Sequence, residues 1–317
     1  MSPQSTRRDL LRMSGTALGT AGIGALAGCS ALVPGGGGGE VVVGSKKFTE
    51  QKILGYLSYV TLRENTDLTV TDKVSLGGTT TNFKALQNDQ IDTYWEYTGT
   101  AWLTLPPKHE EVITDPQQIY ERAGSELEEQ HDLTFLDRAP FNNTYVLLAN
   151  PEWQSETGVE TISDFASYVQ ESGSDTTVVM NAEFQERADG WPGLTEAYGF
   201  ESAASDLTVR NIGSGLTYQV IGEGEAQVGM GFNTNPKILK FDLVPLKDDE
   251  RFFPVYNPAP LCRMDTLENN QAMREPLNAL GDTLSTDTIR ELNRRVSIEG
   301  SDAKAVARDH LERNDLI

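Results

Sequence analysis

The sequence predicts an α/β fold of two lobes, each a mostly parallel sheet with flanking helices. Strand-like apolar runs alternate with helical patterns in two series, over residues 41–97 and 142–231. The chain is expected to cross between the lobes twice, near Asn143 and near residues 253–258, so that the crossing strands form a hinge beside a cleft. A glycine-rich turn, a short helix and a strand also occur once in each series.

This recurrence is a match of spacing, with almost no sequence identity. Fourteen residues separate Phe83 from Tyr97, and the same number separates Tyr218 from Phe232. Aromatic rings at the end of a strand, beside a tight turn, lie where α/β proteins place ligand contacts. The two lobes are therefore expected to share one build and to offer an aromatic ring each to a common space.

The first series indicates a parallel sheet. Val41–Val43, closed by a glycine, is typical of a buried parallel strand. Thr49 is expected to cap a helix over residues 51–65, in which apolar side chains recur at helical spacing. A strand at 68–76, a short helix after the glycine pair and a strand at 91–97 complete a β-α-β-α-β order, which implies right-handed crossovers.

The second series repeats this order, and the chain then ends in helices. Strands are expected at 133–136, 142–149, 177–180, 207–211, 227–231, 252–256 and 260–264. Helices are expected at 115–131, 163–171, 191–198, 215–222, 269–281, 286–298 and 302–313. Because the C-terminal tail adds no sheet, it should pack on the first lobe. The first lobe is thus residues 40–143 with 254–317, and the second is residues 144–253.

The N-terminus has the pattern of an export signal. The pair Arg7-Arg8 precedes a Gly/Ala-rich apolar run that is too short to span a membrane, which needs about 20 strongly apolar residues. Residues 1–28 are therefore expected to be a twin-arginine signal peptide. Leu26 to Cys29 resembles a lipobox, so Cys29 is expected to anchor the protein to the outer face of the cell membrane; an ordinary signal cut elsewhere is the alternative. Residues 29–39, with five consecutive glycines, predict a flexible tether.

Charge and cysteine content exclude several classes of protein. The chain has 26 basic and 47 acidic residues, a net charge of −21, which argues against nucleic-acid binding. Such dispersed acidity is typical of proteins from high-salt organisms, where salt screens the repulsion, although an acidic surface elsewhere is the alternative. With Cys29 assigned to the anchor, Cys262 has no disulfide partner and is expected to be a small buried apolar group.

Few residues suggest catalysis. His109, His131 and His310 are isolated, and none has metal-ligand spacing to another ligand. Ser45 and Ser214 follow glycines but do not complete a nucleophile motif, and no nucleotide-binding loop is present. We therefore expect no enzyme activity, no cofactor and no metal.

Several motifs together resemble the substrate-binding proteins of ABC importers for glycine betaine, choline and related quaternary amines. They are the segments Gly44–Glu50, Gly77–Thr79, Glu96–Thr100, Asn143–Tyr145, Glu183–Leu194 and Phe252–Tyr256. The resemblance runs from about Val41 to Arg313. It implies a type II periplasmic-binding-protein fold, a monomer, and a membrane permease with its ATPase as partners.

The resemblance also implies a binding site. Members of the family enclose a trimethylammonium group in aromatic rings, and the matching positions are Tyr97, Tyr145 and Tyr256, with Phe232 where a tyrosine is usual. Any one of these rings could instead belong to a core.

Betaine-binding members also hold the ligand's carboxylate, which cannot be buried without partners. The matching positions are Lys46, Thr100 and Arg187, with Lys46 preferred over the adjacent Lys47. Asn143 stands where the family often has aspartate and could hold the closed form, and Glu183 could orient Arg187; solvent-exposed roles are the alternative for the lysines and for Glu183.

The predicted function is capture of glycine betaine, or of a related compound such as proline betaine, for uptake as a compatible solute. Retention of both cationic positions favours a ligand with a carboxylate over choline. A choline-specific protein, an amino-acid or polyamine receptor of the same fold, and more remotely an extracytoplasmic enzyme are the alternatives.

Overall fold

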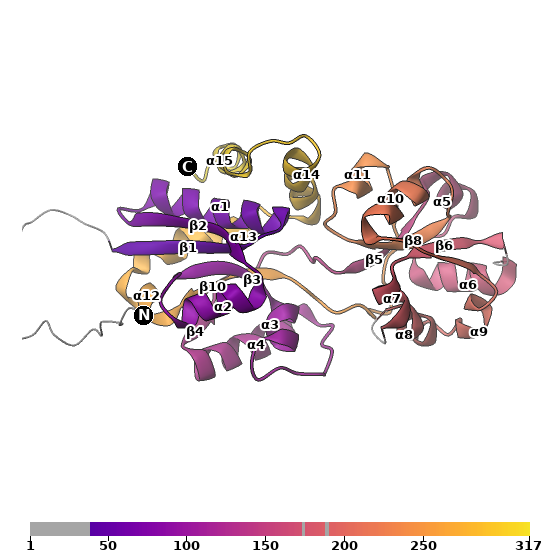
Figure 1. Ribbon diagram of the computed structural model, residues 1–317, viewed down its shortest axis with the longest axis horizontal. Coiled ribbons are helices and arrows are strands. Elements are labelled where there is room, and N and C mark those ends of the chain that lie inside the picture. The colour runs from indigo at the N-terminus through magenta and orange to yellow at the C-terminus, as the bar shows by residue number, and fades with distance from the viewer. Residues whose placement is uncertain (1–38, 173–174, 188–189) are drawn as a thin grey trace, which may run out of the picture. The chain divides into compact units, whose positions relative to one another are not determined.

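The computed structural model describes residues 39–172, 175–187 and 190–317. The predicted signal peptide, Cys29 and nearly all of the predicted tether lie outside the described residues. Within the described residues no helix combines the length and apolar character needed to cross a bilayer. The structure contains two five-stranded sheets, termed here the first and the second sheet (Figure 1).

The first sheet is mixed. Its order is β2 (Thr69–Gly77), β1 (Glu40–Lys46), β3 (Thr93–Tyr97), β10 (Pro258–Arg263) and β4 (Leu133–Phe135). Strand β1 runs parallel to β2 and β3, whereas β10 is antiparallel to both of its neighbours. The predicted parallel core is confirmed, and the returning strand β10 is an antiparallel addition.

The second sheet has the same build. Its order is β7 (Thr208–Asn211), β6 (Thr177–Met180), β8 (Val228–Phe232), β5 (Tyr145–Ala149) and β9 (Val244–Pro245), with β5 antiparallel to β8 and β9. Strands β3 and β8 hold the same place in the two sheets, and each follows a short helix, α2 (Thr79–Gln87) or α10 (Ser214–Gly222). The repeated fourteen-residue spacing therefore falls on equivalent segments, and Tyr97 and Phe232 are the last residues of equivalent strands.

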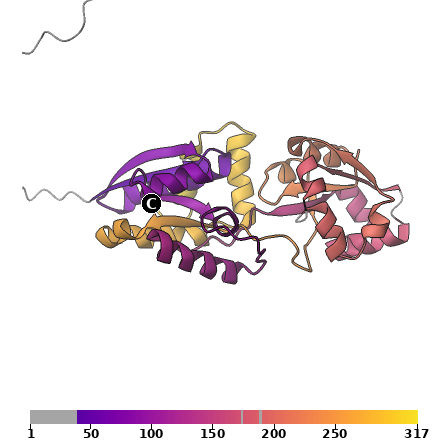
Figure 2. The same ribbon diagram turned by 60° about the horizontal axis from the view of Figure 1, so that its bottom comes forward.

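Helices cover both faces of the first sheet. One core joins it to α1 (Thr49–Asn65), α13 (Arg274–Asp282), α14 (Thr286–Ser297) and α15 (Ala303–Arg313). The other joins it to α2, α3 (Thr98–Thr104) and α4 (Pro116–His131). The C-terminal helices lie beside α1 in both views (Figures 1 and 2), as expected for a tail that packs on the first sheet.

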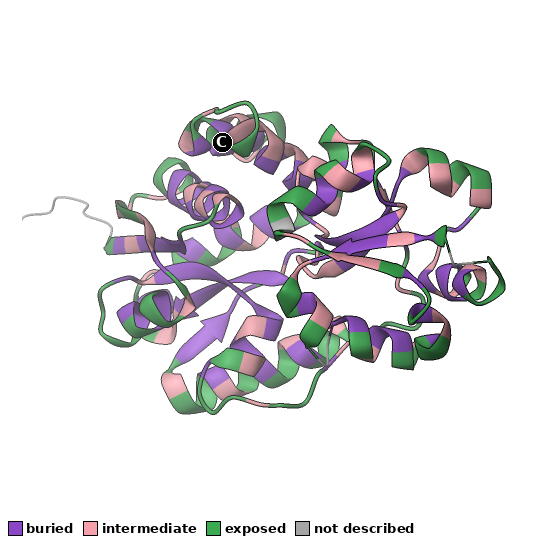
Figure 3. Ribbon diagram, turned by 45° about the vertical axis from the view of Figure 1, so that its right-hand side comes forward, coloured by how far each residue is buried: buried purple, intermediate pink, exposed green. Residues whose placement is uncertain are grey.

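The second sheet is covered in the same manner. One core contains residues of α6 (Ile162–Ser172), α7 (Ala182–Glu186), α8 (Trp191–Ala197) and α9 (Glu201–Ala204), with α5 (Pro151–Thr157) packed at its margin. The other contains residues of α10 and α11 (Lys237–Lys240). Figure 3 shows buried residues concentrated in the inner strands of both sheets, and many helices with exposed residues along one side.

One predicted strand is wrong. Residues 252–256 form no strand, because the amides of Phe252 and Phe253 donate to the Asp248 carboxylate and that of Tyr256 donates to Asn142 Oδ1. These side chains occupy donors that a strand ladder would need.

The predicted helix at 269–281 is present but begins later than expected. A 3₁₀ turn (Gln271–Met273) leads into α13, whereas Asn269 is the last residue of a separate helix, α12 (Met264–Asn269), and the break falls at Asn270. The Asn270 side chain donates to Thr266 O at 3.0 Å, a local bond that competes with helix continuation.

The structure also tests the predictions made for two single residues, Thr49 and Cys262. Helix α1 begins at Thr49 itself, with Phe48 at the N-cap and no side-chain cap, so the predicted capping role of Thr49 is wrong. Cys262 is fully buried as predicted, its thiol donates to Thr93 Oγ1, and burial raises its pKa to about 12.

Candidate functional site

A cavity lies at the carboxyl ends of β1 and β3, which is the edge of a parallel sheet where ligands bind. It measures about 500 Å³ and is termed the first cavity. Its lining residues are Lys46, Lys47, Phe48, Gly77, Gly78, Thr79, Tyr97, Thr100, Asn143 and Tyr256. Five of the predicted site residues therefore meet here. Lys46, Tyr97 and Thr100 come from β1, β3 and α3, and Asn143 and Tyr256 come from the two crossing segments.

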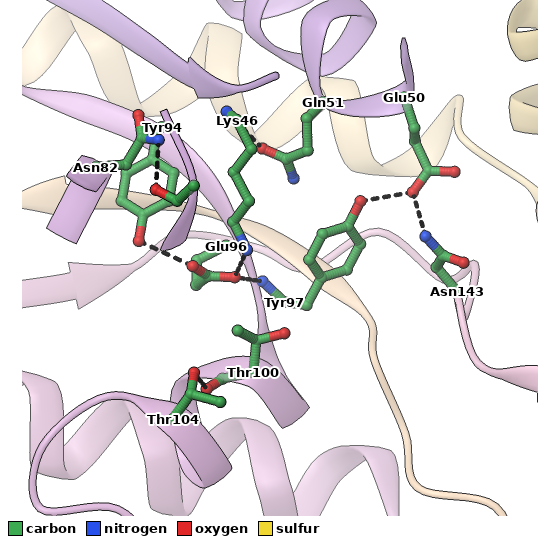
Figure 4. Close-up of polar contacts among 11 residues, drawn as sticks. Lys46, Glu50, Gln51, Asn82, Tyr94, Glu96, Tyr97, Thr100, Thr104 and Asn143 are labelled. Atoms are coloured by element: carbon green, nitrogen blue, oxygen red, sulfur yellow. Dashed lines mark hydrogen bonds and ion pairs between the residues drawn. The ribbon is translucent and has the colours of Figure 1, made fainter. Parts of the chain in front are cut away.

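Lys46 is held by an ion pair that sequence reasoning missed. The side chain is 6% exposed, and its Nζ lies 2.5 Å from Oε1 of the fully buried Glu96 (Figure 4). Glu96 also accepts hydrogen bonds from the Tyr94 hydroxyl at 2.9 Å and from the Tyr97 amide at 2.7 Å. A buried charge is very costly without a partner, so Glu96 keeps the Lys46 ammonium at the cavity wall and balances its charge.

The Tyr97 ring stands beside this pair. Its centroid lies 5.1 Å from Lys46 Nζ and 6.2 Å from that of Phe48, with 18° between the two ring planes. Its hydroxyl donates to Glu50 Oε1 at 2.6 Å (Figure 4). Burial and the neighbouring Glu50 raise the pKa of Tyr97 well above its usual value, so the phenol stays protonated.

Gly99 is required for the position of Tyr256. A Cβ at this glycine would lie 2.8 Å from the Tyr256 ring and closer still to the Val255 carbonyl oxygen. The backbone of Tyr256 is also fixed, since its amide donates to Asn142 Oδ1 at 2.7 Å and its carbonyl accepts from the Asn143 amide at 3.1 Å. The two crossing segments are thus hydrogen-bonded to each other beside the cavity.

A second cavity of about 540 Å³ shares Phe48 and Asn143 with the first. Its other lining residues are Thr49, Glu50, Phe232, Thr234, Asn235, Pro236, Lys237, Asn293, Ser297 and Ile298. Among the predicted rings, Phe232 therefore lies in this second cavity.

Tyr145 packs against Phe232 and the aromatic core of the second sheet. These two residues are paired across β5 and β8, and their rings stack with centroids 5.0 Å apart. Tyr145 also contacts Phe184 at 5.1 Å and Phe253 at 6.3 Å, and lines a third cavity with Asn142 and Thr144. Of the four predicted rings, Tyr97 and Tyr256 thus line the first cavity, whereas Tyr145 and Phe232 lie on strands of the second sheet.

Arg187 is not brought to either of the first two cavities. It follows α7, its side chain is 43% exposed, and Nη1 donates to Glu183 Oε1 at 2.9 Å. The pairing of Glu183 with Arg187 is present, whereas Arg187 does not lie with Lys46 and Thr100 in this structure.

Glu50 is the other residue that sequence reasoning missed. It is 3% exposed, and its two oxygens accept from the Tyr97 hydroxyl, Asn143 Nδ2 at 3.1 Å and Asn293 Nδ2 at 3.0 Å. Burial raises the pKa of Glu50. A single carboxylate among 47 acidic residues carries no information about function. The only sequence feature that could have pointed to Glu50 is its position directly after the segment Lys-Lys-Phe-Thr.

Comparison with known proteins gives the family. Residues 39–313 match the substrate-binding domain of ABC-type glycine betaine transport systems. The chain belongs to this family. Its members are solute-binding components of transport systems that work with a membrane permease, and not enzymes.

Individual relatives agree with this assignment. The chain is 32% identical to the chemotactic signal transduction system substrate-binding protein CosB of Halobacterium salinarum, over 88% of this chain and 85% of that protein. It is also 32% identical to a glycine-betaine-binding protein of Pseudomonas aeruginosa, over 87% and 88% of the two chains. Among solved structures, apo YehZ of Escherichia coli superposes with a TM-score of 0.79 at 29% identity, over 88% of this chain and 99% of that one.

Proposed function

We propose that this protein captures glycine betaine, or a related quaternary amine with a carboxylate, and delivers it to an ABC permease for osmoprotectant uptake. The observation that carries the proposal is the first cavity, where Lys46, Tyr97, Thr100, Asn143 and Tyr256 meet in a member of this family. The Pseudomonas relative is named for glycine betaine.

Aromatic rings suit the ammonium end of such a ligand. A quaternary ammonium has no hydrogen to donate, so it is recognised by the faces of aromatic rings, at about 2 kcal/mol or more per desolvated contact. Tyr97 and Tyr256 would meet it from one lobe, and Tyr145 and Phe232 from the other. This requires closure about the two crossing segments, with residues 40–143 and 254–317 as one lobe and residues 144–253 as the other.

Lys46, Thr100 and Arg187 are proposed to hold the carboxylate. Charge-assisted hydrogen bonds are the ordinary way to bury such a group. Arg187 is the member that must move, because it is half-exposed and paired with Glu183 in this structure. Asn143 would support the closed form through its bond to Glu50, and Glu183 would orient Arg187.

We further propose that the protein acts as a monomer on the outer face of the cell membrane. Residues 1–28 would be removed as a twin-arginine signal, Cys29 would carry the lipid, and residues 29–39 would tether the binding unit. The strongly acidic composition fits work at high salt.

Choline is the second candidate ligand, and a specific contact favours it. Because Glu96 balances the charge of Lys46, the first cavity offers a carboxylate less positive charge than two free cations would. A ligand without a carboxylate would not need Arg187 at all.

Calorimetric titration of the chain from residue 30 onward, in high salt, tests the proposal against glycine betaine, choline and a plain amino acid. We expect betaine to bind, choline to bind more weakly, and the Arg187→Ala variant to lose most of the betaine affinity. Equal affinity for betaine and choline would show that only the cation is recognised. No binding of any quaternary amine would contradict the proposed function.

A further inference from the structure

Helix α14 is hydrogen-bonded to the segment that follows β8, which is far from it in the sequence. Arg290 Nε donates to the carbonyl oxygen of Asn233, and Arg290 Nη2 donates to Oδ1 of the same residue, each at 2.6 Å. Three residues later, on the same face of the helix, Asn293 Nδ2 donates to the carbonyl oxygen of Thr234 at 3.1 Å. We term these bonds the α14 clamp. In the proposed division of the chain they join the two lobes, because α14 belongs to the first lobe and residues 233 and 234 belong to the second.

The Arg290 guanidinium is suited to hold one fixed geometry. Its side chain is 10% exposed, whereas Asp287, which forms an ion pair with it at 3.3 Å, is 89% exposed. A guanidinium is a rigid planar fork, and charge-assisted hydrogen bonds are stronger than those between neutral groups. Hydrogen bonds also weaken steeply when their angles change. The two bonds to Asn233 are therefore strong, and they depend on the angle between α14 and the segment after β8.

Asn233 lies beside the crossing segment that leads into β5. Its amide donates to the carbonyl oxygen of Thr144 at 2.9 Å, and its Nδ2 donates to that of Asn142 at 3.2 Å. Helix α14, in contrast, packs in one core with α1, α13 and α15 on the first sheet. Rotation of the second sheet about the crossing segments therefore turns Asn233 relative to α14 and changes the geometry of the α14 clamp.

The proposed closure requires such a rotation. Tyr97 and Tyr256 line the first cavity, whereas Phe232 lines the second. One ammonium group can contact all three rings only if Phe232 approaches the first cavity. Because Phe232 directly precedes Asn233, this movement also displaces the two oxygen atoms that the guanidinium of Arg290 holds. Closure of the proposed site must therefore weaken or break the α14 clamp.

We propose that the α14 clamp opposes closure, and that Arg290 thereby lowers the affinity of the protein for its ligand. This inference rests on the proposed function and adds to it a positioning residue that does not touch the ligand. Arg290 lines neither the first nor the second cavity, so its replacement leaves the lining of both intact. A ligand binds more weakly when only a fraction of the protein has the binding-competent arrangement, and removal of the clamp should raise that fraction.

Calorimetric titration with glycine betaine tests the effect on affinity. Arg290→Met removes the charge and both donors, and it should bind betaine about fivefold more tightly than the wild type, or better. Arg290→Lys keeps the charge but not the planar fork, and it should bind betaine about twofold more tightly. Loss of a merely structural contact would lower the melting temperature without tightening the binding, so the direction of the change in affinity separates the two roles.

Arg294→Met is the matched control. Arg294 lies one turn further along α14, and it pairs with Glu291 and Glu299, both in the proposed first lobe. Its replacement should leave the affinity for betaine unchanged. If Arg290→Met does not fold, Asn233→Ala removes the Oδ1 acceptor from the other side of the α14 clamp, and this variant should also bind betaine more tightly than the wild type.

A distance measurement tests the arrangement of the protein without ligand. Spin labels attached through Glu129→Cys on α4 and Glu201→Cys on α9, both at exposed positions, report the distance between these two helices. In the chain from residue 30 onward, Cys262 is the one other cysteine, and it is buried. Electron–electron double resonance should show that ligand-free Arg290→Met populates the distances of the betaine-bound wild type more than the ligand-free wild type does.

The outcomes separate this inference from the proposed function. If the wild type binds betaine, and the folded Arg290 variants bind it equally or more weakly, the role of Arg290 alone is overturned. Equal ligand-free distances in the wild type and Arg290→Met overturn it as well. If the wild type binds no betaine, the proposed function is contradicted, and the ligand-free distances still decide whether the α14 clamp holds the lobes apart.

Discussion

The two halves of the protein hold the predicted site residues in different ways. In the first half, Lys46, Glu96 and Tyr97 on the first sheet and Glu50 at the start of α1 are all nearly fully buried and are joined by short hydrogen bonds. On the second sheet, Tyr145 and Phe232 are held by ring packing, and the polar group, Arg187, is exposed. The first half is thus preorganised, whereas in the proposed site the second half would contribute an apolar wall and a polar group, Arg187, that would have to move.

Of all the changes considered, removal of the Glu96 charge should lower the stability of the protein most. Glu96→Gln leaves the buried Lys46 ammonium without its counter-charge, which typically costs about 3–5 kcal/mol of unfolding free energy. Urea denaturation of the two proteins measures this loss.

The matched change in the second half is Glu183→Gln, which breaks the exposed pair with Arg187. An exposed pair contributes about 0–1 kcal/mol, so this variant should unfold close to the wild type. Equal destabilisation by the two variants would mean that the halves do not differ as described.

Truncation of one ring in each half sharpens the comparison. If rings from both sheets enclose the ammonium, Tyr97→Ala and Tyr145→Ala should each lose about 2 kcal/mol of betaine binding, or about 30-fold in affinity. Calorimetric titration with glycine betaine provides both values. An unchanged affinity in Tyr145→Ala would confine recognition to the first half.

A methyl group at Gly99 tests the placement of Tyr256. Gly99→Ala puts a Cβ against the Tyr256 ring and the Val255 carbonyl oxygen, and such overpacking costs about 1–3 kcal/mol. We expect a lower melting temperature and weaker betaine binding.

Gly213→Ala is the control in the second half, because nothing lies within 4 Å of a Cβ at that glycine, which also precedes a short helix. Gly213→Ala should change neither the melting temperature nor the affinity for betaine. If Gly99→Ala binds betaine like the wild type, Tyr256 does not contact the ligand.

The smallest effect is expected from His310, a buried residue of α15 whose ring is hydrogen-bonded to Thr283 and which lines neither cavity. Burial lowers the pKa of His310 below its usual 6.5, so the folded protein binds this proton less tightly than the unfolded chain does. Its contribution to stability is therefore complete above about pH 6.5 and is lost as the pH falls below that value. The unfolding free energies of the wild type and of His310→Gln should therefore be measured across this pH range. We expect the wild type to lose more stability than the variant as the pH falls. If the two proteins lose stability equally, His310 does not have this role.

Much of the fold could be predicted because its signals are local. Apolar periodicity located α1 and β6 closely, and the spacing from Phe83 to Tyr97 marked the same unit as that from Tyr218 to Phe232. The misplaced strand at 252–256 and the break at Asn270 could not be found in this way, because side chains bind backbone groups there in place of the regular ladders.

The site was predictable only in its residue types. Lys46 pairs with Glu96 across fifty residues of sequence, and Glu50 meets Asn293 across 243, so neither contact leaves a local pattern. The resemblance to betaine-binding proteins supplied the positions of Tyr97, Tyr145, Phe232 and the others, but not the balance of charge around them. That balance follows from long-range packing.

The most direct test of the account is a crystal structure of the protein with glycine betaine bound. We predict a single ligand that contacts Tyr97 and Tyr256 in the first half and Tyr145 and Phe232 in the second, with Arg187 turned from Glu183 toward the carboxylate. A betaine that contacts rings of the first sheet alone, with Arg187 still paired to Glu183, would contradict the account.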